Sequence, residues 1–181
     1  MKIIAISGAL RKASTNTGLL RALKDMASGK AELEVVTLHG IPLFDEDDIA
    51  ARGKPAVVTE LAERIRASDG VIIATPEYQF SVPGVLKNAN DWLSICNAPF
   101  KWKRTGIVGA SAGAMAGTAR AQYHLRQNLQ GLQAIVMPRP EVLIVHNELK
   151  FDSNGNLTDA ETRAYLQKWF NAFLEWVEKK P

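Results

Sequence analysis

Residues 7–18, SGALRKASTNTG, concentrate groups that bind anions between a short apolar run and a segment with helical periodicity. Gly8 permits a sharp turn, and five donor side chains precede the expected helix: Arg11, Ser14, Thr15, Asn16 and Thr17. The free N–H groups and the dipole at a helix N-terminus favour a negative charge. Capping of the helix by Ser14 or Thr15 is the competing interpretation. Because a cap requires neither an arginine nor four small donors, the pattern favours a phosphate site.

Two common nucleotide-binding motifs are missing from the chain. It contains neither the Gly-Lys-Ser/Thr of a Walker loop nor a Gly-x-Gly-x-x-Gly sequence. These loops hold nucleoside triphosphates and dinucleotides, respectively. The chain is therefore not expected to bind a nucleoside triphosphate or a dinucleotide in the manner of a Rossmann fold.

Two further loops follow apolar runs, at residues 75–84, TPEYQFSVPG, and residues 109–117, GASAGAMAG. The first loop has aromatic and amide groups that can hold a flat heteroaromatic ligand by stacking and edge hydrogen bonds. The second consists almost entirely of small residues, so its backbone can approach a ligand closely. A phosphate loop, an aromatic loop and a small-residue loop together describe a mononucleotide pocket for a planar ring. FMN matches this description better than a simple sugar phosphate does.

Apolar runs alternate with helical patterns along the chain, and this alternation places the three loops. Strands are expected at residues 3–6, 33–38, 71–75 and 106–110, and helices at residues 19–27, 58–65, 83–93 and 115–129. Residues 134–137 and 141–145 form either two strands or one strand interrupted by Pro138 and Pro140. The last helix is expected to begin at Thr158, with Glu161 completing a capping box.

Five strand–helix units in alternation imply a parallel sheet with helices on both faces. The strand-first order predicts a flavodoxin-like α/β fold, a three-layer sandwich with a five-stranded parallel sheet in the order 2-1-3-4-5. Residues 1–181 are expected to form one such domain. Ligands of these folds bind beyond the carboxyl ends of the strands, where the three loops lie.

Two polar segments receive no binding role from their sequence patterns. The acidic residues 45–48 are interpreted as a solvated loop. Residues 152–156, DSNGN, resemble the start of a calcium loop, but their glycine is at the fourth position and no glutamate closes a twelve-residue frame. The second segment is therefore predicted to be a turn, and no metal site is predicted.

Composition excludes several classes of function. The 181 residues are 46% hydrophobic and 23% charged, with a net charge of 22 − 19 = +3 from scattered Lys and Arg. Such scattering is not expected of a protein that binds nucleic acid. Cys96 is the only cysteine, so no internal disulfide can form and a reducing, cytoplasmic environment is expected, with Cys96 as a small buried hydrophobe. No window has the roughly 18 apolar residues of a membrane span, and the apolar N-terminal run is too short for a signal peptide.

Three quoted segments carry a resemblance to a known family. GALRKASTN resembles the Gly-Ser-Leu-Arg-x-x-Ser-x-Asn loop of NAD(P)H-dependent FMN reductases. PEYQFSVPGVLKNANDWLS resembles the Pro-Glu-Tyr-Asn-x-Ser-x-Pro-Gly-x-Leu-Lys-Asn-Ala-x-Asp-Trp signature of that family. SAGAMAGTARAQYHLRQ resembles the bacterial quinone and chromate reductase branch. The resemblance runs from Gly8 to about Glu141.

The resemblance implies roles for individual residues. Arg11, Ser14 and Asn16 would hold the FMN phosphate, with Thr15 and Thr17 nearby. Five residues would line the isoalloxazine ring: Pro76, Glu77, Tyr78, Gln79 and Phe80. Ser111 and Gly113 would reach its polar edge.

The resemblance also implies a reaction. NADPH or NADH would pass hydride to bound FMN, and a quinone, free flavin, chromate or another small acceptor would then take the electrons. The cofactor performs this chemistry, so no catalytic side chain is assigned. His124 is expected at the surface or at an interface. Members of the family are homodimers or homotetramers, and the same is expected here.

Two positions depart from the family pattern and leave alternatives open. Ala9 replaces a serine and Gln79 replaces an asparagine, and either change could weaken FMN binding or retune the flavin. A binding module that has lost its cofactor is therefore one alternative. A flavodoxin-type electron carrier that does not oxidise nicotinamides is another, although flavodoxins are usually acidic. An azoreductase is a neighbouring enzymatic alternative.

Overall fold

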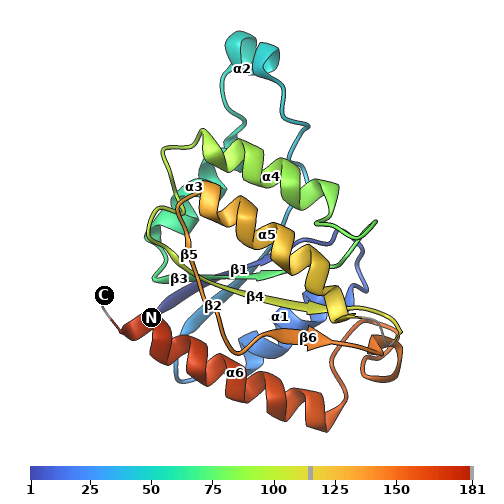
Figure 1. The fold of residues 1–181 in the computed structure, drawn as a ribbon. Coiled ribbons are helices and arrows are strands. Elements are labelled where there is room, and N and C mark those ends of the chain that lie inside the picture. The colour runs from blue at the N-terminus through green and yellow to red at the C-terminus, as the bar shows by residue number, and fades with distance from the viewer. Residues whose placement is uncertain (114–115, 180–181) are drawn as a thin grey trace.

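A parallel β-sheet forms the centre of the computed structural model, which describes residues 1–113 and 116–179 (Figure 1). Its strands are β1 (Lys2–Ser7), β2 (Glu32–Thr37), β3 (Gly70–Ala74), β4 (Arg104–Ala110), β5 (Ile135–Val136) and β6 (Val142–Ile144). The strand order is β2-β1-β3-β4-β5, and β6 also pairs with β4. The predicted order 2-1-3-4-5 is confirmed.

The fifth position of the sheet holds two short strands. Strand β5 pairs with Arg104 and Thr105 at the start of β4, whereas β6 pairs with residues 108–110 at its end. Pro138 and Pro140 lie between the two strands and have no N–H to donate to a ladder. The sheet therefore has six strands rather than the predicted five, although only five positions.

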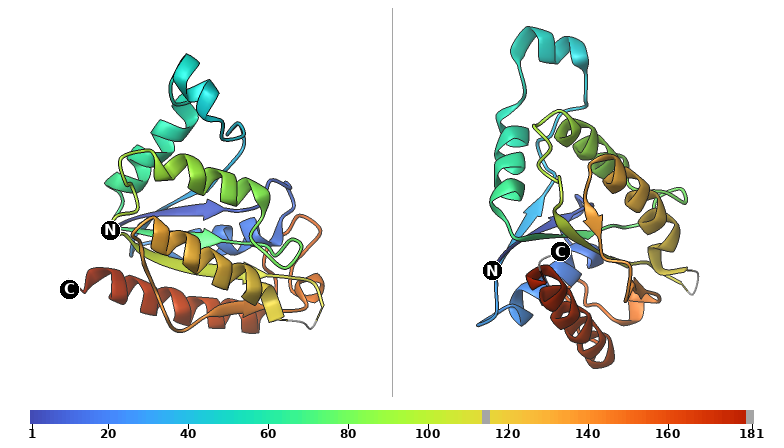
Figure 2. Two further views of the ribbon diagram at one scale, coloured as in Figure 1. Left: turned by 45° about the horizontal axis from the view of Figure 1, so that its top comes forward. Right: turned by 60° about the vertical axis from the view of Figure 1, so that its left-hand side comes forward.

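Helices cover both faces of the sheet, as Figure 2 shows from two sides. One face packs against α1 (Thr15–Met26) and α6 (Ala160–Glu178). The opposite face packs against α3 (Ala56–Ala67), α4 (Gly84–Ser94) and α5 (Ala119–Gly131). Every residue of β3 is buried, as expected for a central parallel strand covered on both faces. The three-layer, flavodoxin-like architecture is confirmed.

Residues 45–48 differ from their predicted loop structure. They enter a short helix, α2 (Glu46–Arg52), which has no buried residue and stands away from the sheet at the top of Figure 1. The carboxylate of Asp45 accepts a hydrogen bond from the backbone N–H of Asp47 at 2.9 Å. This cap, together with acidic residues in the first turn, favours a helix at a segment with no apolar stripe.

One predicted helix start is wrong, and a second lies outside the described residues. Helix α6 begins after Asp159, whose carboxylate accepts from the backbone N–H of Thr162 at 2.7 Å. The hydroxyl of Thr158 instead donates to the carbonyl oxygen of Lys150 at 3.1 Å, so the predicted capping box does not form. The predicted start of the preceding helix, Met115, lies outside the described residues, and α5 begins at Ala119.

Three other predictions concern single features. Cys96 is buried, as expected. The DSNGN segment forms a turn in which the Asp152 carboxylate accepts from the backbone N–H groups of Asn154 at 2.9 Å and Asn156 at 2.8 Å. None of the helices within residues 1–113 and 116–179 is long and apolar enough to cross a membrane.

Candidate functional site

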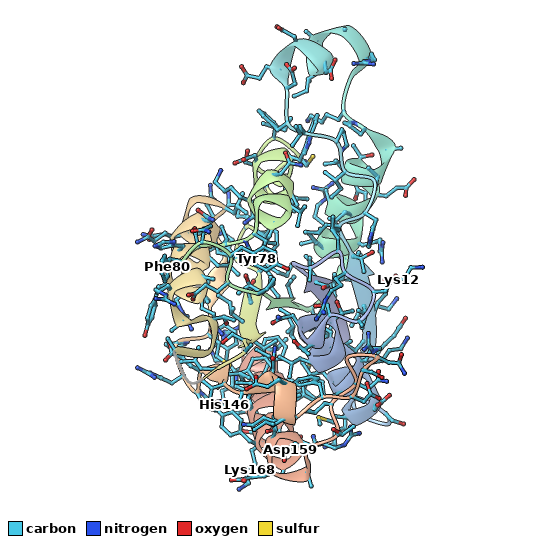
Figure 3. All side chains as sticks on the ribbon, turned by 90° about the vertical axis from the view of Figure 1, so that its right-hand side faces the viewer. Lys12, Tyr78, Phe80, His146, Asp159 and Lys168 are labelled. Atoms are coloured by element: carbon cyan, nitrogen blue, oxygen red, sulfur yellow. The ribbon has the colours of Figure 1, made fainter. Side chains whose placement is uncertain are left out.

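The three loops meet because β1, β3 and β4 are neighbours in the sheet and all end at the same edge. The backbone N–H of Gly8 donates to the carbonyl oxygen of Ala74 at 2.8 Å, which joins the first loop to the end of β3. Figure 3 looks onto this edge, with Lys12 marking the first loop and Tyr78 and Phe80 the second. Proximity of the loops, which the fold class predicts, is confirmed.

Side chains of the first loop are partly used within the protein. The Asn16 amide donates to the carbonyl oxygen of Ala110 and accepts from its N–H, both at 2.9 Å. The hydroxyls of Thr17 and Ser7 lie 2.7 Å apart. Ser14 caps α1 by accepting from the backbone N–H of Thr17 at 3.4 Å. These bonds fix the loop against the ends of β1 and β4.

Other donors of the same loop remain uncommitted. The backbone N–H groups of Thr15 and Asn16, in the first turn of α1, make no hydrogen bond with any other described residue. The Arg11 and Lys12 side chains are exposed beside them. Free N–H groups at the end of a twelve-residue helix, with two cations nearby, suit a phosphate. The donor set therefore fits the phosphate of FMN.

The second loop places two aromatic rings at the rim of the sheet edge. Tyr78 and Ser81 exchange N–H to carbonyl bonds at 3.0 Å, and the two residues between them, Gln79 and Phe80, have φ values of 48° and 61°. Two positive φ values at these positions are typical of a type I′ turn, for which glycine and asparagine are preferred. Tyr78 and Phe80 are 56% and 60% exposed, which leaves their rings accessible to a ligand.

Beneath this turn, the predicted ring-lining residues have different surroundings. Pro76 is buried where the loop leaves β3. The Glu77 side chain is only 8% exposed, and its carboxylate accepts from Arg120 Nε at 2.6 Å and from the N–H of Ala121 at 3.2 Å. The charged end of Glu77 therefore contacts α5.

His124 lies on α5 at the surface, as predicted, and contacts the same loop. Its Nδ1 is 2.9 Å from the hydroxyl of Ser81. This pair is a second connection between the aromatic turn and α5.

The small-residue loop supplies a polar atom without a partner. The hydroxyl of Ser111 is buried and has no hydrogen-bond partner among the described residues. Its backbone is held by hydrogen bonds to Ile144 and Asn147. Gly113 has a φ of 71°, and its N–H donates to the Glu148 carboxylate at 3.3 Å. Residues 114 and 115 of this loop lie outside the described residues.

Sequence reasoning missed Asn147, which joins two of the loops. Its side-chain amide donates to the Thr15 hydroxyl at 2.8 Å, and its backbone N–H donates to the carbonyl oxygen of Ser111 at 3.1 Å. His146 beside it is labelled in Figure 3. The polar run that follows the apolar residues 142–145 is the signal that could have found this segment.

A groove of about 540 Å³ extends from the first loop along this segment, lined among others by Arg11, Thr15, Asn147, Glu148 and Asp152. The pKa of Glu148 is lowered by hydrogen bonding, first from its own backbone N–H and then from His146. The pKa of Asp152 is lowered chiefly by its hydrogen bonds from Asn156. Both carboxylates are thus ionised near neutral pH, so the cations of Arg11 and Lys12 define the anion-binding end of the site.

A larger cavity of about 820 Å³ lies elsewhere, between residues 139–145 and the start of α6. None of the predicted site residues lines it. Among the described residues, no cluster of three or more His, Cys, Asp or Glu could hold a metal ion. The sheet edge with its three loops is therefore the candidate functional site.

Comparisons with known proteins identify the family of the chain. A family model described as NADPH-dependent FMN reductase matches residues 1–148. An NAD(P)H-dependent FMN reductase of Pseudomonas aeruginosa is 42% identical over 180 residues, which cover 99% of this chain and 96% of the relative. A quinone reductase of Escherichia coli K12 is 40% identical over 183 residues, covering 99% and 96% of the two chains.

A solved structure extends the comparison to three dimensions. FerB of Paracoccus denitrificans, a flavoenzyme NAD(P)H:(acceptor) oxidoreductase, matches with a TM-score of 0.85 and 32% identity. The match covers 98% of this chain and 97% of FerB. The family model matches residues 1–148, and the relatives and the solved structure match nearly the full length, so the chain belongs to the NADPH-dependent FMN reductase family.

Proposed function

We propose that this protein is an NAD(P)H-dependent oxidoreductase that uses FMN to reduce small acceptors, with quinones as the first class to test. The observation that carries the proposal is the convergence, at one sheet edge, of a free helix N-terminus with Arg11, two exposed aromatic rings and the unpaired hydroxyl of Ser111. FMN, when bound, would supply the redox chemistry between the nicotinamide and the acceptor.

The protein's own residues bind and orient the cofactor. Arg11 and the N–H groups of Thr15 and Asn16 hold the phosphate, while Ser14 and Thr17 shape the loop. The side chain of Asn16 acts indirectly, because Ala110 uses both of its polar atoms. This division of roles follows from which groups have partners within the protein.

The residues of the other two loops would hold the ring portion of FMN. Tyr78, Gln79 and Phe80 line it, and Pro76 stiffens the start of the loop. Ser111 and Gly113 supply the polar edge, since the buried hydroxyl of Ser111 needs a partner.

Finer assignments form part of the same proposal. Free flavin and chromate are further acceptors to test. Residues 1–181 act as one FMN-binding domain in the cytoplasm, as a homodimer or homotetramer. Sedimentation analysis would detect the oligomer as two or four times the chain mass of 19.8 kDa.

The test is an absorption spectrum of the purified protein loaded with FMN, recorded before and after anaerobic addition of NADPH or NADH. Retained flavin that bleaches with a nucleotide and recovers its colour with a quinone supports the reductase. Retained flavin that neither nucleotide bleaches would identify an electron carrier instead. If no flavin is retained and added FMN does not support nicotinamide oxidation, the proposal fails in favour of a binding module.

A further inference from the structure

The helix α5 begins without a cap from its own sequence. Thr118 precedes it in a left-handed conformation, with a φ of 73°, and its side chain makes no capping hydrogen bond. Glu77, 44 positions earlier in the chain, supplies the missing acceptor to the N–H of Ala121 at 3.2 Å. A carboxylate at a helix N-terminus satisfies a free N–H group and the helix dipole together.

The second carboxylate oxygen of Glu77 binds the side chain of Arg120. Nε of Arg120 donates to it at 2.6 Å, and a terminal guanidinium nitrogen contacts the same oxygen. The guanidinium also lies over the ring of Phe80, 4.2 Å from its centroid. Glu77, Arg120 and Phe80 thus form one continuous contact, which we name the 77–120 latch.

The aromatic turn needs such a contact because its backbone is strained. Gln79 and Phe80 both adopt left-handed conformations that favour glycine, and such conformations persist only where surrounding contacts stabilise them. The latch contacts the turn from one side through Phe80, and the pair of Ser81 and His124 contacts it from another. Both contacts come from α5.

We infer that Glu77 and Arg120 are positioning residues for the flavin ring, which rests on the proposed function. Their contacts hold the turn of residues 78–81 in its ligand-ready conformation and tie it to the start of α5. Glu77 also neutralises Arg120, whose cation would otherwise stand unpaired beside the ring that Phe80 lines. Neither role requires Glu77 to touch the flavin.

Glu77→Gln tests the inference with a side chain of the same size. The carboxylate accepts from Ala121 on one oxygen and from Arg120 on the other, whereas the amide of glutamine has one oxygen, and its NH2 group is itself a donor that would face one of these two partners. Glu34→Gln is the matched control, because Glu34 pairs with Arg64 between β2 and α3, away from the three loops. Both variants lose one carboxylate from an arginine pair.

In the apoprotein, residue-resolved hydrogen exchange measures how stably the latch holds the turn, without any flavin. Glu77→Gln is expected to speed exchange at the N–H groups of Tyr78, Ser81 and Ala121, whereas Glu34→Gln leaves them unchanged. Equal exchange in wild type and Glu77→Gln at these three positions would overturn the inference. A rise spread evenly over the sheet would also overturn it, since that signals general destabilisation.

Flavin binding provides the second reading. Quenching of FMN fluorescence is expected to give a dissociation constant about tenfold higher for Glu77→Gln than for wild type. The reason is that a smaller fraction of the protein has the turn of residues 78–81 in the conformation that binds FMN. The flavin reduction potential is expected to rise, because an unpaired cation favours the more negative, reduced flavin. Loss of affinity with an unchanged potential would overturn the charge-neutralising role.

Two further results separate the inference from the proposed function. Wild-type protein that binds no FMN would defeat the function, while the exchange experiment would still decide the latch. If Glu77→Gln does not fold, Arg120→Lys replaces it, since lysine keeps the charge but lacks the planar group that stacks on Phe80. Faster exchange at Tyr78 and Ser81 in Arg120→Lys supports the latch, and unchanged exchange overturns it.

Discussion

At the residue scale, the site is defined by the polar groups that the protein leaves unpaired. Most buried polar groups in proteins have hydrogen-bond partners, and of the four buried side-chain atoms without one among the described residues, the Ser111 hydroxyl is the one that lies in the three loops. The N–H groups of Thr15 and Asn16 are likewise uncommitted, and the Arg11 guanidinium is exposed beside them. A phosphorylated, flat ligand would satisfy all of these groups together.

Arg11→Ala tests the phosphate assignment directly. Loss of one charge-assisted contact is expected to weaken FMN binding by roughly 10- to 100-fold. Riboflavin lacks the phosphate, so its affinity should change little. Fluorescence titration with both flavins measures the difference, and Arg52→Ala on the distant α2 is the control. An equal loss of affinity for FMN and riboflavin would show that Arg11 does not contact the phosphate.

At the scale of elements, the position of α1 depends on a close contact with the 152–156 turn. A Cβ added at Gly18 would lie 1.8 Å from the carbonyl oxygen of Gly155. Gly155 itself has a φ of 73° and packs against the backbone of Ala13 in the first loop. The turn thus supports the loop that precedes α1. The close contact with Gly155, rather than helix propensity, explains why position 18 is a glycine.

Gly18→Ala and Gly131→Ala are therefore expected to have opposite effects on stability. Alanine normally stabilises a helix relative to glycine, and Gly131 has open space around its Cβ position. Urea unfolding should show Gly131→Ala as more stable by about 0.5–1 kcal/mol. Gly18→Ala should be less stable by about 1–3 kcal/mol, because the backbone of the turn must move. Stabilisation by Gly18→Ala would contradict the close packing.

At the scale of the whole molecule, the segment between β6 and α6 links stability to pH. It carries Glu148, Asp152 and Asp159, and all three have a lowered pKa. For Asp159, the main cause is hydrogen bonding from the side chain and then the backbone of Thr162. A lowered folded-state pKa means that each ionised carboxylate stabilises the fold at neutral pH, and that this contribution is lost on acidification.

Acid is accordingly expected to lower the free energy of unfolding from about pH 5 downward, as these groups become protonated. Asp159→Asn keeps a capping group but removes one titration. It should be less stable than wild type at pH 7, and the difference should shrink as the pH falls below the ordinary aspartate pKa of about 3.9. Urea unfolding at several pH values measures this. A difference that is independent of pH would show that the charge of Asp159 contributes nothing.

The sequence by itself determined the fold class, the strand order and the three loops of the candidate site. Apolar runs and helical spacing report burial directly, because each residue's environment follows from the local geometry of its own element. Neighbouring parallel strands then bring their carboxyl ends to one edge, so the loops of β1, β3 and β4 could be grouped without coordinates. The sequence did not decide whether residues 134–137 and 141–145 form one strand or two, because prolines permit either a break or a bulge.

Only the tertiary structure decided which polar groups face a ligand and which are used within the protein. Asn16 binds the backbone of Ala110, Glu77 caps α5, and Asn147 joins its own loop to Thr15 in the first loop. Each of these bonds joins residues 44 to 132 positions apart. Spacing along the chain reports neighbours within one element, whereas such pairs form only when several elements pack, so no local pattern could reveal them.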